Sequence, residues 1–137
     1  MGFTVYTTDD GRNLPNEYLP AGAITPKLGM TLKLTAGKLS VAKGAEIPLY
    51  ISMTERDKAC TDGEIIPVVR VGEDVVWRTT ASVAMTGAAL GDRVTISADG
   101  MEVTATKGGQ AEIVGMDGTE KGCMVRVRLL GGYDSGE

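Results

Sequence analysis

The chain has 137 residues, of which 42% are hydrophobic and only 4% aromatic, and its formal net charge is −4. This length suits one domain with a core of aliphatic side chains, and the scattered basic residues disfavour non-specific binding to nucleic acid. The sequence contains no histidine, which excludes mechanisms that use a histidine as the general base.

The first 28 residues contain prolines at positions 15, 20 and 26. Proline fixes φ and lacks a backbone donor, so we expect neither a helix nor a central strand here. The segment still carries many apolar residues, among them Leu14, Tyr18, Leu19 and Ile24. We therefore predict an extended N-terminal arm over residues 1–28 that packs on something, with docking on a neighbour at least as favoured as folding back.

Alternating apolar residues follow the arm. Met30, Leu32 and Leu34 alternate with polar residues, and the alternation resumes at Leu39 after Ala36 and Gly37, which predicts a hairpin. Three more apolar runs predict short strands, the second of them at an edge or a bulge because it contains Pro67. These runs are Leu49–Met53, Ile65–Val71 and Val75–Trp77.

The second half is divided by turn residues. Residues 79–91 are small and uncharged, and at most one short helix is expected there, between Ala81 and Leu90. Four further strands are predicted up to Leu130, at Val94–Ala98, Glu102–Thr106, Gln110–Met116 and Met124–Leu130. We expect residues 131–137 to form a flexible tail.

These elements predict a mainly β fold. Residues 29–130 are expected to form a single β domain, either a small β-sandwich or a partly closed β-barrel. The extended arm precedes this domain, and at most one short helix accompanies it.

Candidate chemistry is sparse. Glu55 with Asp57 is a pair of carboxylates, but a solvated loop explains it. Residues 117–120 carry oxygen ligands without the spacing of a calcium loop, and Gly108-Gly109 stands in no phosphate-binding motif, so a hairpin turn explains it. We therefore expect no enzyme activity, no cofactor and no metal site.

Cys60 and Cys123 are the only cysteines. Two unpaired thiols in a reducing compartment are favoured over one long-range disulfide. No apolar run reaches the roughly 20 residues that cross a bilayer, and the N-terminal residues do not resemble a signal peptide. We expect a soluble protein with no membrane partner.

Trp77 is the sole tryptophan. Tryptophan is enriched at binding hot spots, which makes this residue a candidate anchor. It also shares a strand face with Val75, so packing in the core is favoured and a subunit contact is the second interpretation.

A series of strand and turn phrases covers most of the chain from Tyr18 to Leu130. The phrases are Tyr18–Pro26, Gly29–Leu34, Pro48–Met53, Ile66–Val71, Gly91–Val94, Ala111–Gly115 and Val125–Leu129. In these phrases the chain resembles small head-decoration (capsid cement) proteins of tailed bacteriophages. Residues 54–64 and 79–91 match no feature of that family.

The resemblance implies a β-rich structural protein without enzyme activity. Such proteins attach to the outer surface of the expanded head, commonly as homotrimers, and bind the major capsid protein. A bound copy that bridges coat subunits stabilises the mature shell relative to other states. The chain would then be made in the host cytoplasm and located on the virion. The expected capsid or intersubunit contacts are Leu14, Tyr18, Leu19, Ile24 and Trp77.

Two other functions stay open. A small β-barrel could bind a peptide or a saccharide in a groove lined by Trp77 and tyrosines. Low aromatic content disfavours sugar stacking but leaves peptide binding along an exposed edge open. The chain could also be another structural subunit of a shell or a tail.

Overall fold

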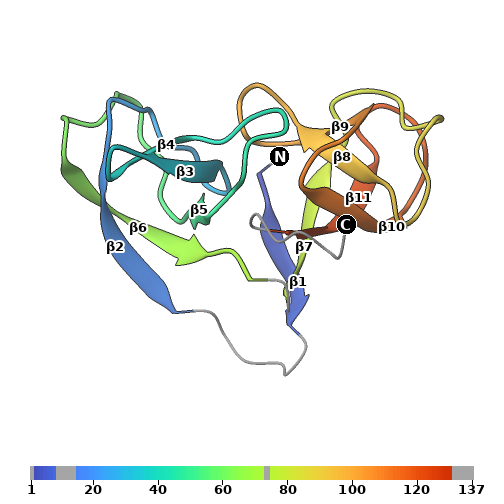
Figure 1. Ribbon diagram of the computed structural model, residues 1–137, viewed down its shortest axis with the longest axis horizontal. Coiled ribbons are helices and arrows are strands. Elements are labelled where there is room, and N and C mark those ends of the chain that lie inside the picture. Colours follow the sequence, from blue (N-terminus) through green and yellow to red (C-terminus); the bar gives the residue numbers. More distant parts are fainter. Residues whose placement is uncertain (1, 9–14, 73–74, 131–137) are drawn as a thin grey trace.

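The computed structural model describes residues 2–8, 15–72 and 75–130. These residues form two β-sheets and no helix (Figure 1), which confirms the mainly β fold. The strands are β1 Thr4–Thr8, β2 Asn16–Ala21, β3 Thr31–Thr35, β4 Lys38–Val41, β5 Tyr50–Ser52, β6 Glu64–Arg70, β7 Val75–Thr80, β8 Arg93–Ile96, β9 Val103–Lys107, β10 Ala111–Met116 and β11 Met124–Leu129.

The six-stranded sheet has the order β1-β7-β11-β10-β8-β9, and all its neighbouring strands are antiparallel. Side chains alternate between its faces as a strand requires. Val75 and Trp77 of β7 and Val125 and Val127 of β11 are buried on the core face. Val76 and Arg126 between them point to the opposite face, where Val76 is also covered, at 7% exposed.

The other five strands close into a ring of order β2-β4-β3-β5-β6. The predicted hairpin is β3–β4, and its turn residues Ala36 and Gly37 have φ angles of 52° and 81°. Positive φ at both turn residues matches the right-handed twist of the two strands. The ring encloses a second apolar core that includes Leu32, Leu39 and Ile66.

The first 28 residues are largely extended, but they fold back on their own chain. β1 pairs with β7 at one edge of the six-stranded sheet, and β2 pairs with β6 along its whole length. The expectation that no inner strand could form here was wrong for β2, which also meets β4 at Ala21. Proline lacks a backbone N–H, but at Pro20 this loss interrupts few hydrogen bonds, because only Ala21 at the end of β2 pairs with β4.

Residues 81–90, where a short helix was allowed, form turns and one isolated bridge. Gly87 and the β-branched residues of this segment disfavour helix. The predicted tail, residues 131–137, lies outside the described residues.

The two sheets lie side by side, with β1 and β7 between the ring and the rest of the six-stranded sheet (Figure 1). Ile51 and Val69 from the ring belong to the same core cluster as Trp77. Backbone hydrogen bonds also join the sheets, since Gly44 and Ile96 exchange bonds of 2.8 and 3.0 Å. The two sheets therefore meet at this first cluster, which we call the shared core, and the ring also has its own core.

Thr31 is the main polar link at this joint. Its side chain is fully buried, and Oγ1 donates toward Ala42 O at 2.7 Å and Gly100 O at 3.1 Å. The Thr31 N–H also donates to Gly100 O, at 2.9 Å. One residue of β3 is thus tied to the loop that follows β4 and to the turn that connects β8 with β9.

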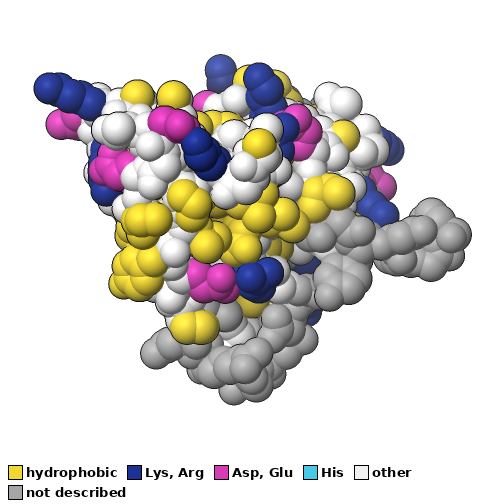
Figure 2. Space-filling view, turned by 60° about the vertical axis from the view of Figure 1, so that its left-hand side comes forward, with side chains coloured by type: hydrophobic (Ala, Val, Ile, Leu, Met, Phe, Trp, Pro, Cys, Tyr) yellow, Lys and Arg dark blue, Asp and Glu magenta, His cyan; other side chains and the backbone are white. Residues whose placement is uncertain are grey.

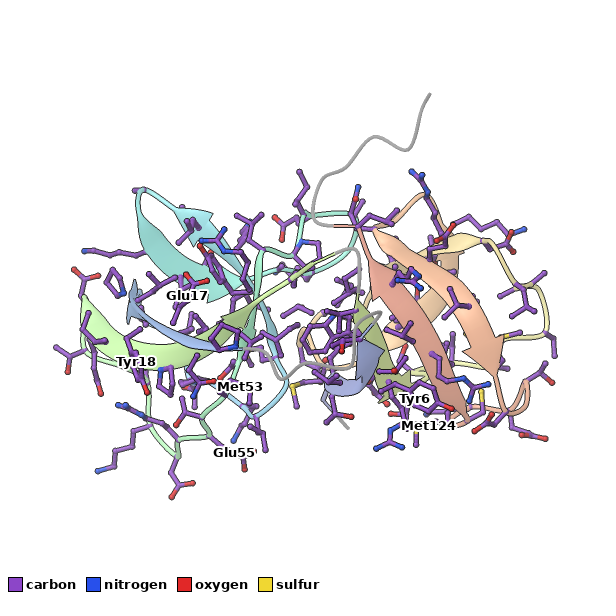
Figure 3. All side chains as sticks on the ribbon, turned by 90° about the horizontal axis from the view of Figure 1, so that it is seen from below. Tyr6, Glu17, Tyr18, Met53, Glu55 and Met124 are labelled. Carbon is purple, nitrogen blue, oxygen red and sulfur yellow. The ribbon has the colours of Figure 1, made fainter. Side chains whose placement is uncertain are left out.

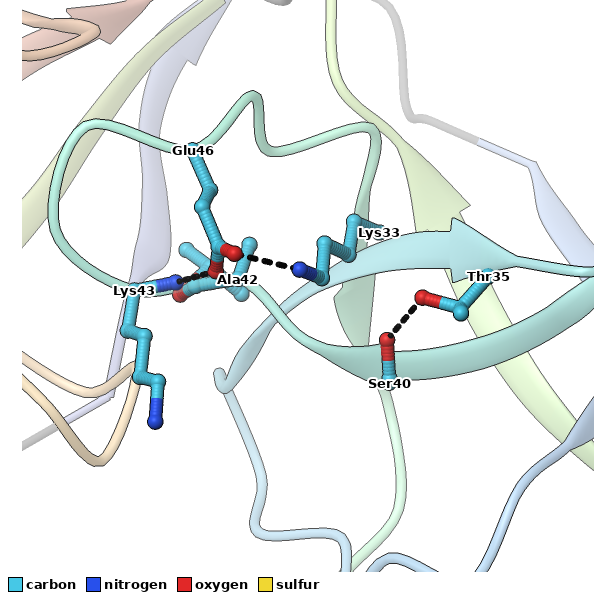
Figure 4. Close-up of polar contacts among 7 residues, drawn as sticks. Lys33, Thr35, Ser40, Ala42, Lys43 and Glu46 are labelled. Carbon is cyan, nitrogen blue, oxygen red and sulfur yellow. Dashed lines mark hydrogen bonds and ion pairs between the residues drawn. The ribbon is translucent and has the colours of Figure 1, made fainter.

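We expect Thr31→Val to lower the free energy of unfolding by about 1–3 kcal/mol, because valine keeps the shape but removes the donor from two buried carbonyls. Urea unfolding followed by circular dichroism would measure this. The control is Thr35→Val, because the Thr35 hydroxyl forms its hydrogen bond with the Ser40 hydroxyl on the exposed surface of the same hairpin (Figure 4). A loss at position 31 no larger than at position 35 would contradict the proposed link.

The loop that carries Gly44 is held by Glu46 (Figure 4). The Glu46 carboxylate pairs with the Lys33 ammonium and accepts the Lys43 N–H at 3.0 Å. The hydrogen bond from Lys33, followed by that from the Lys43 backbone, lowers the pKa of Glu46 below its ordinary value. These contacts orient the loop toward β8.

Candidate binding surface

The outer face of the β2–β6 pair is apolar and open. In the antiparallel register Tyr18 lies opposite Pro67 and Pro20 lies opposite Ile65, and directly opposed residues share a face of the sheet. Tyr18 is 65% exposed and Ile65 is 55% exposed, while both prolines are half-buried. We call these four residues the β2–β6 face.

The sequence of β6 is apolar on both of its faces. Ile66 and Val68 point into the ring core, and Ile65, Pro67 and Val69 point the other way. Strands that read as continuous apolar runs are usually covered on both sides. Here the six-stranded sheet covers Val69, which is 4% exposed, but leaves the Ile65 end open.

An apolar groove of about 330 Å³ continues this surface toward β1. The Met53 N–H donates to Pro67 O at 3.0 Å, so the groove begins beside the β2–β6 face. We call this hollow the β1 groove; its lining residues are Phe3, Thr4, Val5, Leu28, Gly29, Met53, Val69 and Trp77.

The pictures agree with this continuity. Hydrophobic side chains gather into a patch on the side of the molecule that carries β2 and β6 (Figure 2). In the view from below, Tyr18 and Met53 lie on the side of the ring, with Met53 nearer to the six-stranded sheet, and Tyr6 and Met124 lie on the side of the six-stranded sheet (Figure 3).

Two polar contacts lie near this surface, and the first of them is on the ring side of the β2–β6 pair, because Glu17 lies opposite Val68 and Arg70 is two residues from Val68. Arg70 donates to the Glu17 carboxylate at 3.0 and 3.3 Å and lies over the Tyr50 ring, 5.1 Å from its centroid. The hydrogen bond that Arg70 donates to Glu17 raises the pKa of Arg70 above its ordinary value. Glu55 accepts the Leu28 N–H at 3.4 Å beside the groove.

The structure separates the predicted contact residues. Tyr18 is exposed on the β2–β6 face, whereas Leu19 and Ile24 are half-buried and pack against the ring core. Trp77 is 1% exposed in the shared core, as the favoured interpretation expected, so it offers no surface to a partner in this form. Leu14 lies outside the described residues.

Sequence reasoning missed several residues of the same surface, namely the exposed Val5, Leu28, Met53 and Ile65 and the half-buried Pro67. A signal for two of them was present. The run Ile65–Val69 is apolar at every position, which indicates a strand that seeks cover on both faces. The sequence contained no signal that Val5 and Leu28 belong to one surface, because these two residues come together only in the folded chain.

Within the described part of the chain, no group of three or more His, Cys, Asp or Glu side chains lies close enough together to hold a metal ion. Cys60 and Cys123 are both free thiols, as the favoured interpretation held. Burial, followed by the charge of Glu120, raises the pKa of Cys123, so its thiolate form is disfavoured. No helix long and apolar enough to cross a membrane occurs among these residues.

Comparison with models of protein families and with curated protein sequences found no match to this chain.

Proposed function

We propose that the chain is a capsid decoration protein of a tailed bacteriophage, which binds the outer surface of the expanded head and bridges coat subunits. The observation that carries the proposal is the apolar β2–β6 face, because β6 has the composition of a strand covered on both faces and only one is fully covered. Exposed apolar patches are typical of interaction sites.

The mechanism is selective binding. A copy whose apolar face fits only the mature arrangement of coat subunits lowers the free energy of that arrangement relative to the immature or burst shell. Closely paired strands joined to a second sheet through a common core present this face rigidly, which limits the entropy lost on binding. Repetition over the symmetric shell multiplies a modest affinity per site.

The remaining parts of the proposal follow from the sequence resemblance. The partner is the major capsid protein, the bound form is a homotrimer, and the location is the outside of the virion. No catalytic role and no nucleic-acid partner are included.

Co-sedimentation with expanded capsids of the same phage tests the proposal. We expect the unaltered chain to sediment with expanded capsids, and Ile65→Asp to weaken binding about tenfold or more, as for a hot-spot residue. The matched control is Ile47→Asp, since Ile47 is also exposed, at 43%, but lies in the loop before β5. Failure of the unaltered chain to bind would overturn the function. Equal effects at positions 65 and 47 would overturn the role of the β2–β6 face.

A further inference from the structure

β1 is an edge strand with an apolar exterior. It pairs with β7 on one side, and no other strand of the described chain pairs with it on the other. Val5 and Tyr6 are 43% and 52% exposed. An exposed apolar edge strand offers unpaired backbone groups to another chain.

On the side away from β7, Gly29 flanks the chain at Phe3, and the open side of β1 begins beyond it. The Phe3 N–H points away from β7, because it donates to Gly29 O at 2.9 Å. Backbone groups of a strand alternate in direction with a period of two, so the N–H and C=O of Val5 point to the same open side. No backbone hydrogen bond joins Val5 to a described residue outside the β1–β7 ladder.

The β1 groove runs along this open side. Phe3, Thr4 and Val5 all line it, although successive side chains of a strand point to opposite faces. A groove on one face of the strand would be lined by alternate residues. Lining by three consecutive residues indicates a groove that follows the edge of the strand. Leu28 and Met53 form the opposite wall, at the end of the β2–β6 face.

The floor of the groove contains an unused donor. Trp77 lies opposite Val5 on the core face of the sheet, and its Nε1 is buried without a hydrogen-bond partner among the described residues. A buried donor without a partner is rare and costly. Val5, Met53 and Trp77 line the same groove, so an acceptor that entered between them would approach the indole ring.

We propose that the β1 groove captures an extended apolar segment of a coat subunit, which adds to β1 as a further strand. This inference rests on the proposed function. An extended peptide supplies together what the groove lacks: backbone partners for Val5, an apolar side chain to lie between Val5, Leu28 and Met53, and carbonyl acceptors near Trp77. An aliphatic chain or a sugar supplies only part of this set.

The first test compares Val5→Pro with Val5→Ala in co-sedimentation with expanded capsids. Both variants remove the branched valine side chain, but only proline removes the outward N–H, and proline is tolerated where the N–H of an edge strand faces solvent. We expect Val5→Pro to bind at least about fivefold more weakly than Val5→Ala, from the loss of a backbone hydrogen bond. If the unaltered chain binds capsids and the two variants bind equally well, the inference of strand addition is overturned, and the proposed function is not.

The second test does not depend on whether variants at position 5 fold. Hydrogen exchange of the N-terminal segment is measured in the unaltered protein, free and bound to capsids. We expect the Val5 amide to become protected on binding, and unchanged exchange would overturn the inference. Protection that appears in the free protein as its concentration rises, together with dimers in solution, would show that a second copy occupies the groove.

The third test addresses the apolar wall. Leu28→Asp should weaken capsid binding about tenfold or more, whereas Leu90→Asp should stay within about twofold. Leu28 lines the groove, and Leu90 is a similarly exposed leucine in the loop before β8. Equal effects of these two substitutions would contradict an occupied groove. If the unaltered chain does not bind capsids at all, the proposed function fails, and this inference fails with it.

Discussion

Trp77→Ala is expected to lower the free energy of unfolding by about 3–5 kcal/mol, the loss typical of a large aromatic side chain deleted from a core. Trp77 is 1% exposed and lies between Val5 and Val127 in one row across the six-stranded sheet. Its core cluster also includes Ile51 and Val69 of the ring. The substitution therefore opens a cavity where the two sheets meet.

Urea unfolding followed by circular dichroism would measure this loss, because the substitution removes the only tryptophan fluorophore. Trp77→Phe should cost less, since it keeps an aromatic ring and breaks no hydrogen bond of Nε1. The surface control is Tyr18→Ala, for which we expect a change within about 0.5 kcal/mol. Similar losses at positions 18 and 77 would contradict the placement of Trp77 in the shared core.

The strands were largely predictable from alternation. The hairpin β3–β4 and strands β8 to β11 lie within a few residues of the predicted runs, because their side chains alternate between a covered face and an open one. The partners of these strands were not predictable. β1 pairs with β7 and β2 with β6, across long stretches of sequence, and period-two patterns carry no information about such pairing.

Pro67 shows the same limit. It was expected at an edge or a bulge, yet β6 has neighbours on both sides, β2 and β5. Pro67 is tolerated because the β5 ladder ends at Ser52 opposite Val68, and beyond it only the Pro67 carbonyl is used, as acceptor for Met53. The candidate surface was predictable at Tyr18, which was singled out from an apolar segment rich in proline. Its groove was not, because β1, Leu28 and Met53 meet only after the ring and the six-stranded sheet have packed together.

The Gly108-Gly109 pair was interpreted as a hairpin turn, and this prediction was wrong. β9 and β10 are not neighbours, because β8 lies between them in the sheet order β10-β8-β9. The chain between them passes over the start of β8, where both glycine N–H groups lie near Arg93 O, at 2.9 and 3.4 Å. The crossing brings Gly109 against the β8 backbone.

Gly109→Ala is expected to lower the free energy of unfolding by about 3 kcal/mol or more, as in severe overpacking. A Cβ on Gly109 would lie 2.1 Å from Val94 O and 2.5 Å from Thr95 Cα. These are backbone atoms of a paired strand, so no side-chain rotation relieves the clash. Either β8 or the segment that contains Gly109 must shift its backbone.

Gly108→Ala is the matched control. Gly108 has a φ of +96° but no atom within 4 Å of a Cβ at that position, so only the conformational cost of about 1–2 kcal/mol applies. Thermal or urea unfolding of both variants would compare the two effects directly. A loss at position 109 no greater than at position 108 would mean that the chain does not cross β8 at close range, and the sheet order would then need revision. A larger loss at position 109 would instead identify the close crossing, rather than turn conformation, as the reason for glycine there.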